Sequence, residues 1–130
     1  MKNKDAKIYQ GCVLLVDDDE MIRKPVKQML EVIGMKTFTA SSGKEALRIF
    51  KDNTDTIDCV LLDYVMPDMN GKETFRKLCK IHPEIKVLIS SGNDQEEIQE
   101  QFKGKNIVGF LPKPYSFNNL QMKIKEVFER

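Results

Sequence analysis

Four consecutive apolar residues, from Cys59 to Leu62, end on the carboxylate of Asp63. Pro67 and Gly71 follow shortly afterwards, so turn residues bound the apolar run. A short, uninterrupted run of this kind predicts a strand that is buried on both faces, and such strands are typical of parallel sheets. In open parallel sheets the working site lies at the carboxyl ends of the strands. We therefore expect Asp63 to stand at that edge.

Four further strand patterns accompany this one, and each of the five is followed by a helical pattern. The first runs from Cys12 to Val16 and ends on three aspartates, while the others cover residues 35–40, 85–90 and 108–111. Five alternations of strand and helix with short connections predict an α/β fold, a doubly wound (βα)5 three-layer sandwich with helices on both sheet faces. Pro112 cannot donate to a strand ladder, which favours an edge position for the last strand.

The helix boundaries are marked by capping residues. Ser42, Asp94 and Ser116 are predicted to cap the second, fourth and fifth helices. Asp19 and Glu20 are expected to cap or charge the start of the first helix. Gly34 ends the first helical pattern, and Pro25 falls near its first turn, where a missing N–H costs least. Five apolar residues recur in that pattern at a spacing near 3.6 and predict its inward face: Met21, Ile22, Met29, Leu30 and Ile33.

The 130 residues predict one domain over residues 11–130, preceded by a flexible leader over residues 1–10. A net charge of +1 gives no electrostatic case for binding nucleic acid or a membrane surface. The polar start lacks a signal core, and no apolar run could span a bilayer, so we expect a cytoplasmic protein. Its three cysteines show no metal-binding spacing and are expected to be reduced.

The residues that end the predicted strands suggest a site. Asp17, Asp18 and Asp63 end the first and third strands, Ser91 ends the fourth, and Lys113 follows the fifth. Parallel strands bring these groups to one rim, where two carboxylates about 4 Å apart repel by about 4 kcal/mol. A divalent cation offsets that repulsion, and oxygen ligands with open positions suit Mg²⁺ or Mn²⁺. Lys113 adds a compact positive charge.

Such a site suits phosphoryl transfer, which depends on positioning and charge neutralisation more than on covalent help. A carboxylate can act as the acceptor and form an aspartyl phosphate. Asp63 is the natural acceptor, because it is the single acid at its strand end. A bound cation, Lys113 and the hydroxyl of Ser91 would then contact the phosphoryl oxygens.

Over roughly residues 11–129 the chain resembles the receiver domain of two-component response regulators. Four segments carry the resemblance: VLLVDDD at 13–19, LLDYVMPDMNG at 61–71, ISSG at 89–92 and GFLPKP at 109–114. The resemblance implies a flavodoxin-like fold whose five-stranded parallel sheet has the order 2-1-3-4-5. Spacing alone does not determine that order. The sequences of the last two segments also resemble those of receivers attached to hybrid histidine kinases.

The resemblance implies a role for each matching residue. Asp63 corresponds to the phosphorylated aspartate and Asp18 to a direct Mg²⁺ ligand, whereas Asp17 acts largely through water. The backbone carbonyl of Val65 is a further ligand. Ser91 corresponds to the serine or threonine that contacts the phosphoryl group, and Ser90 competes with it for that role.

Two residues near the fifth strand complete the implied set. Lys113 corresponds to the phosphate-binding lysine, and the bond from Lys113 to Pro114 is expected to be cis. Phe110 corresponds to an aromatic switch residue. When Ser91 moves toward the phosphoryl group, Phe110 fills the space it leaves, and the face formed by the fourth helix, fifth strand and fifth helix changes.

The implied donor is the phosphohistidine of a histidine kinase or a histidine phosphotransfer domain, and the output partner is not readable. The domain is expected to be a monomer or a weak dimer and no enzyme, apart from assisting its own phosphorylation and dephosphorylation. It is either a single-domain regulator or part of a larger protein. The alternative is an interaction module with the receiver fold that takes no phosphate. A nucleotide-binding flavodoxin-like protein would need a Gly/Ser/Thr-rich loop where the three aspartates lie.

Overall fold

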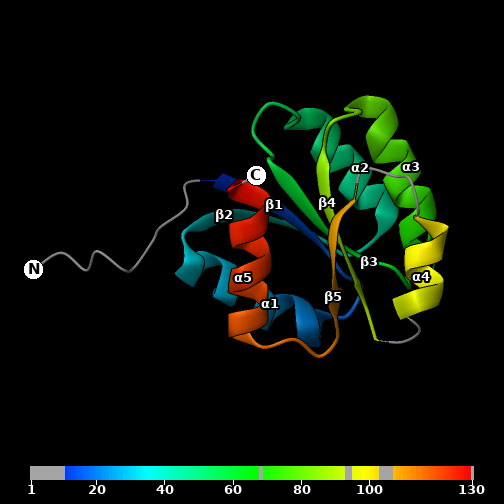
Figure 1. Ribbon diagram of the computed structural model, residues 1–130. Coiled ribbons are helices and arrows are strands. Elements are labelled where there is room, and N and C mark those ends of the chain that lie inside the picture. The colour runs from blue at the N-terminus through cyan, green and yellow to red at the C-terminus, as the bar shows by residue number, and fades with distance from the viewer. Residues whose placement is uncertain (1–10, 68, 93–94, 103–106, 130) are drawn as a thin grey trace, which may run out of the picture.

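The computed structural model describes residues 11–67, 69–92, 95–102 and 107–129 (Figure 1). The predicted leader, residues 1–10, and the predicted cap Asp94 lie outside these residues. No helix in the described part of the chain is long and apolar enough to cross a membrane.

In the described part of the chain, a single sheet of five parallel strands forms the centre, in the order β2-β1-β3-β4-β5 (Figure 1). The predicted fold class and strand order are therefore confirmed, and so is the edge position of the last strand. The strands are β1 (Gly11–Val16), β2 (Met35–Ala40), β3 (Cys59–Asp63), β4 (Lys86–Ser91) and β5 (Ile107–Pro112).

Among the described residues, five helices follow the strands in turn and cover both faces of the sheet (Figure 1). Helices α1 and α5 pack on one face, and α2, α3 and α4 pack on the other. The arrangement is the expected three-layer sandwich. The helices are α1 (Glu20–Ile33), α2 (Gly43–Asp52), α3 (Gly71–Ile81), α4 (Gln95–Gln101) and α5 (Phe117–Phe128).

Alternation along each strand divides the core into two halves. In β1, Val13 and Leu15 pack toward α1 and α5, whereas Leu14 and Val16 pack toward α2, α3 and α4. All four are buried, and each such side chain contributes roughly 1.5–3 kcal/mol on leaving water. A slip of one residue would exchange the two faces, so this packing fixes which groups reach the carboxyl edge.

Two predicted caps are confirmed. The Ser42 hydroxyl accepts a hydrogen bond from the backbone N–H of Glu45 (3.1 Å), and the Ser116 hydroxyl caps α5 in the same way. The Glu45 carboxylate accepts from the backbone N–H of Ser41 (2.7 Å), one residue before the cap. Gly34 ends α1 at φ 111°, a left-handed conformation that glycine adopts without a steric penalty.

The start of α1 differs from the prediction in two ways. Met21, predicted to face inward, is 84% exposed. Pro25 lies inside the helix instead of near its start, because Asp19 caps α1 and the helix already begins at Glu20. Met21 lies about 140° around the helix from Val26 and about 180° from Leu30, so it faces away from the core. Val26, Leu30 and Ile33 supply the buried stripe.

Candidate functional site

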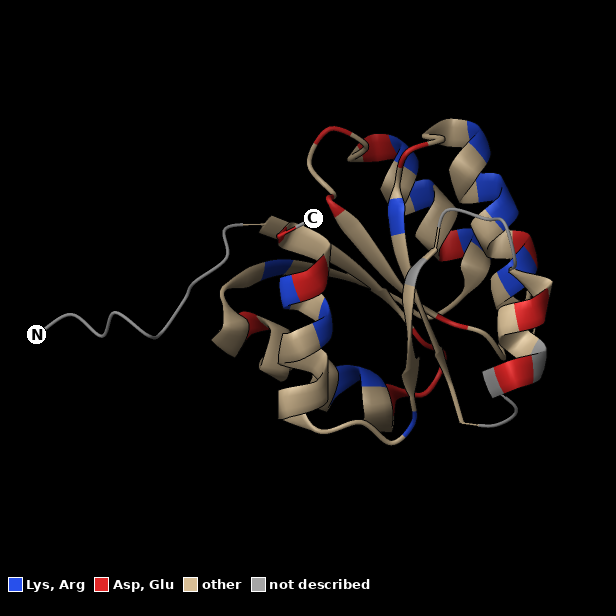
Figure 2. Ribbon diagram, in the orientation of Figure 1, with Lys and Arg blue, Asp and Glu red and all other residues tan. Residues whose placement is uncertain are grey.

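Three acids converge at the carboxyl edge of the sheet. The carboxylates of Asp17, Asp18 and Asp63 each offer an oxygen, and these oxygens lie within 4.8 Å of one another. Asp17 and Asp63 are only 2% and 4% exposed, whereas Asp18 is exposed. Figure 2 shows acidic segments at the ends of β1 and β3 and a basic one just after β5. The structure thus brings together acids that are far apart in the sequence.

Lys113 joins this cluster from the fifth strand. Its Nζ lies 2.8 Å from Asp17 Oδ2 and 3.2 Å from Asp63 Oδ1. The backbone N–H of Lys113 donates to the carbonyl of Ser91 (2.8 Å), which ties the lysine to the end of β4. The peptide bond between Lys113 and Pro114 is cis, as expected.

The charges in this cluster do not balance. Burial, opposed by Lys113 and reinforced by Asp17, raises the pKa of Asp63 from 3.8 to about 6. Burial alone would lower the pKa of Lys113, but its hydrogen bond to Asp17 and the charge of Asp63 outweigh burial and raise that pKa. One ammonium faces three carboxyl groups, so the acids of this cluster outnumber its one lysine. The site therefore favours an additional cation.

The two neighbouring aspartates are held differently. Asp17 Oδ1 accepts a hydrogen bond from the backbone N–H of Asp19 (2.9 Å), and Asp17 Oδ2 pairs with Lys113. Both Asp17 oxygens are therefore engaged. No such partner binds the Asp18 carboxylate within the described part of the chain, so its oxygens are available to a ligand.

The loop after Asp63 folds back onto the acceptor position. The backbone N–H of Val65 approaches Asp63 Oδ1 (3.3 Å), and the N–H of Gly71 donates to the carbonyl of Tyr64 (2.7 Å). A Cβ on Gly71 would lie 2.7 Å from the Cα of Tyr64 and 2.8 Å from the Asp63 carbonyl oxygen. This close approach requires glycine, which explains why the loop closes there.

Ser90 and Ser91 are both buried at the end of β4. Ser90 pairs in register with Asp63, and Ser91 follows it. Ile89 pairs in register with Phe110, and both pack toward α2, α3 and α4; by alternation Ser91 shares that face. Ser91 is thus the serine that shares a sheet face with Phe110.

An aromatic cluster extends from this face to the end of α4. The ring centroid of Phe102 lies 6.3 Å from that of Phe110, 6.1 Å from Tyr64 and 5.4 Å from Phe75. The Tyr64 hydroxyl also donates to the side chain of Gln101 in α4. The residue after Asp63 is thereby linked to α4 by direct contact.

The structure adds one residue that the motif segments do not include. Arg23, in α1, donates from Nη1 to the carbonyl of Asp17 (2.7 Å). A basic side chain one turn into the helix that follows an acidic cluster is the sequence signal that could have identified it.

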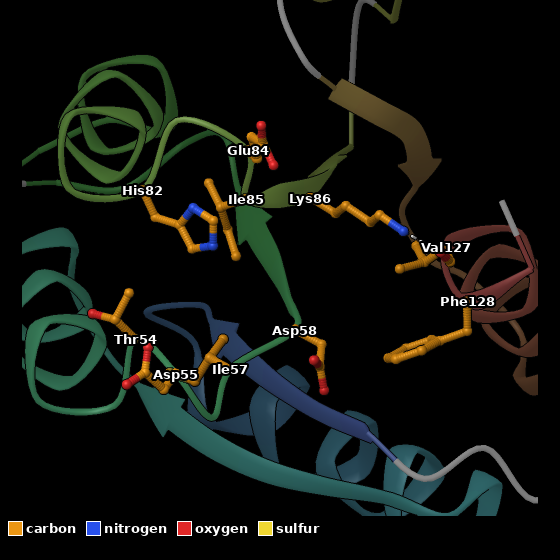
Figure 3. Close-up of a pocket in the computed structure, with 10 residues that line it drawn as sticks. All are labelled: Thr54, Asp55, Ile57, Asp58, His82, Glu84, Ile85, Lys86, Val127 and Phe128. Carbon is orange, nitrogen blue, oxygen red and sulfur yellow. Dashed lines mark hydrogen bonds between the residues drawn. The ribbon is translucent and has the colours of Figure 1, made fainter.

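Two grooves lie at opposite ends of the strands, one at the carboxyl ends and one at the amino ends. One, of about 430 Å³, borders Lys113 and is mostly apolar, with walls from α1 and from the segment after β5 that include Met21, Pro25 and Tyr115. The other, of about 380 Å³, is shown in Figure 3 and lies at the amino ends of the strands. There Lys86 Nζ donates to the carbonyl of Val127 (2.9 Å), which ties β4 to α5. This second groove contains none of the predicted site residues.

Hard oxygen ligands, a neighbouring ammonium and a buried carboxylate are the parts that phosphoryl transfer to an aspartate requires. The predicted residues Asp17, Asp18, Asp63 and Lys113 lie in one cluster. Ser91 adjoins it through the backbone of Lys113.

Comparison with known proteins gives a consistent family. The model of the response regulator receiver domain matches residues 13–125. Sensor kinase CckA of Brucella abortus is 36% identical over 118 residues, which are 91% of this chain but 12% of that protein. The chain therefore spans a small part of this relative's length.

Solved structures show the same similarity. A receiver domain protein from Clostridium thermocellum has a TM-score of 0.87 at 32% identity, with 92% of this chain and 95% of that chain covered. CheY in the CheX–CheY–BeF3–Mg complex of Borrelia burgdorferi has a TM-score of 0.86 at 28% identity, with 97% and 94% covered.

Proposed function

The chain belongs to the response regulator receiver domain family of two-component signalling, and from this premise we propose that Asp63 accepts a phosphoryl group from a phosphohistidine, assisted by Mg²⁺. One observation carries the proposal: carboxylates from β3 and from the end of β1 lie within 4.8 Å of one another, beside a lysine from the end of β5. The unbalanced negative charge there supports a divalent cation.

The donor set fits Mg²⁺ or Mn²⁺. Asp18 and Asp63 would bind the ion directly, the backbone carbonyl of Val65 would add a third protein oxygen, and Asp17 would contribute through water, because Lys113 already occupies it. Bound there, the ion neutralises charge on the phosphoryl oxygens. The complex of a similar CheY with BeF3 and Mg is consistent with this proposal.

The chemistry asks little of the protein beyond position. An oxygen of Asp63 attacks the phosphorus, the P–N bond to the donor histidine breaks, and the imidazole leaves with the electron pair. The ammonium of Lys113, which pairs with Asp63 at 3.2 Å, then pairs with the oxygens of the transferred phosphoryl group. Attack of water on the acyl phosphate later restores the carboxylate. The domain thus assists only its own modification.

Phosphorylation is read out through α4, β5 and α5. Ser91 moves toward the new oxygens, and Phe110, which is partly buried, turns inward. Phe110 contacts Phe102 at the end of α4, so its movement alters the packing of that helix. The output partner binds the altered face. We propose that this domain contacts neither nucleic acid nor a membrane.

The donor is a histidine kinase or a histidine phosphotransfer domain. The apolar groove beside Lys113 supports a protein donor, because it borders the acceptor site and includes the exposed side chain of Met21. An apolar helix face of the donor would cover it. Such a donor works in the cytoplasm, where we place this domain, as a regulator or as the receiver of a hybrid histidine kinase.

Intact-mass spectrometry after treatment with a small acyl phosphate tests the proposal. With Mg²⁺ present, the wild-type protein is expected to gain the mass of one phosphoryl group. Asp63→Asn is expected to gain none, because an amide is not a nucleophile of this kind. If the wild type takes no phosphoryl group, the chain is the phosphorylation-independent interaction module instead.

The same assay also tests where a protein donor docks, separately from whether Asp63 can react. Met21→Asp is expected to leave phosphorylation by the small donor unchanged, since Met21 points away from the core at the groove. Transfer from a phosphorylated histidine protein should become slower. Equal transfer rates from that protein to Met21→Asp and to wild type would exclude the groove as the docking surface.

A further inference from the structure

The peptide that joins Asp17 to Asp18 is held by a side chain from α1. Arg23 Nη1 donates to the carbonyl oxygen of Asp17 at 2.7 Å, a short, charge-assisted hydrogen bond in a partly buried setting. Arg23 itself is held by the helix, since its backbone N–H donates to the carbonyl of Asp19 (2.8 Å). The loop between β1 and α1 is therefore tied to α1 at Asp17 and Asp19.

The Asp18 carboxylate depends on this backbone. It has no partner among the described residues, so the loop determines where its oxygens lie. The N–H of Asp17 donates to the carbonyl of Ala40 (3.1 Å), and the Asp17 carboxylate accepts from the N–H of Asp19 (2.9 Å). These two bonds hold either end of the turn. The bond from Arg23 fixes the orientation of the peptide plane between them.

We propose that Arg23 is a positioning residue, which orients Asp18 for a divalent cation by holding the Asp17 carbonyl. The inference rests on the proposed metal site. It gives Arg23 a role in cation binding even though its own charge opposes a cation nearby. Groups that orient metal ligands without touching the metal typically change metal affinity by about 10–100-fold.

A charge effect and a positioning effect of Arg23 predict opposite changes in Mg²⁺ affinity. If Arg23 acted only through its charge, its removal would strengthen Mg²⁺ binding, because a neighbouring positive charge would be gone. If it positions Asp18, its removal weakens Mg²⁺ binding despite the loss of charge. The direction of the change therefore separates the two roles.

Calorimetric titration of the unphosphorylated protein with Mg²⁺ measures that direction. Arg23→Gln is expected to raise the dissociation constant about tenfold. Arg23→Lys keeps the charge and one donor and should fall between that variant and wild type. Lys24→Gln is the matched control, since Lys24 pairs with exposed Glu20 at 3.0 Å and should bind Mg²⁺ as tightly as wild type or more tightly. Thermal melting without metal checks that each variant is folded.

Unchanged or tighter Mg²⁺ binding by Arg23→Gln would overturn the inference. If that variant does not fold, Arg23→Met, which has no donor, decides: Mg²⁺ binding as tight as or tighter than that of wild type overturns the inference, and weaker binding supports it. A wild-type protein that binds no Mg²⁺ would instead refute the metal site in the proposed function. The two failures are therefore distinguishable.

Discussion

Replacing Lys113 with methionine is expected to slow phosphorylation of Asp63 by a small acyl phosphate about 10²–10³-fold, the usual effect of removing one fixed charge-stabilising donor. The lysine lies 2.8 Å from Asp17 and 3.2 Å from Asp63, so its ammonium is already placed where charge must be neutralised during transfer. Methionine has a similar length and no charge. The rate of mass gain at saturating Mg²⁺ measures the effect.

Lys86→Met is the matched control for Lys113→Met. Lys86 is also partly buried and donates to a backbone carbonyl, that of Val127, but at the opposite edge of the sheet (Figure 3). Its removal should lower stability without changing the phosphorylation rate. If Lys113→Met were phosphorylated within threefold (~0.7 kcal/mol) of the wild-type rate, charge neutralisation by Lys113 would be excluded.

Asp63→Asn is expected to stabilise the metal-free protein at pH 8 by about 2 kcal/mol. Burial raises the pKa of Asp63 from 3.8 to about 6, which corresponds to about 3 kcal/mol against the ionised form in the folded protein. The pKa of about 6 already includes the opposing ion pair with Lys113. Asparagine avoids this net penalty, but burying its uncharged amide has a smaller cost that returns part of the gain. Urea denaturation in the presence of a chelator measures the difference.

The gain should depend on pH in a defined direction. Because the pKa of Asp63 is higher in the folded than in the unfolded state, the folded protein holds this proton more tightly. Wild-type stability therefore falls as the pH rises from about 4 to about 6, and the penalty is complete above that range. The advantage of Asp63→Asn should be greatest at pH 8 and nearly vanish at pH 4.

Asp18→Asn serves as the control for the stability measurement. Asp18 is exposed, so its carboxylate is hydrated, and the substitution should change stability by less than about 0.5 kcal/mol. A loss of stability in Asp63→Asn at pH 8, or a gain that is the same at pH 4, would contradict the view that Asp63 is ionised at a net cost. Such a cost is what a bound cation would relieve.

Much of the fold was predictable, because the strand signals are local. The run ending on Asp63 and the run from Cys12 to Val16 are too apolar to lie anywhere but in a covered sheet. The strand order, in contrast, was not predictable from the strand signals. Crossover lengths are compatible with several orders, and the order followed from the family resemblance, which the structure confirms.

The acidic cluster was predictable for the same reason: parallel strands deliver their end residues to one edge. The contacts that hold the cluster were not. Arg23 reaches the Asp17 carbonyl through a long side chain whose direction depends on where α1 begins. The cap Asp19 was predictable from its place before the helix. Periodicity nevertheless turned Met21 inward, because a shift of one residue moves a side chain about 100° around the helix.

Anomalous diffraction from a crystal soaked in Mn²⁺ tests the central claim most directly, namely that acids from two strand ends share one cation beside the acceptor. The predicted result is a single Mn²⁺ peak bound by the carboxylates of Asp18 and Asp63 and by the carbonyl of Val65. A protein whose Asp18 and Asp63 carboxylates lie apart, with no peak between them at saturating Mn²⁺, would contradict the account.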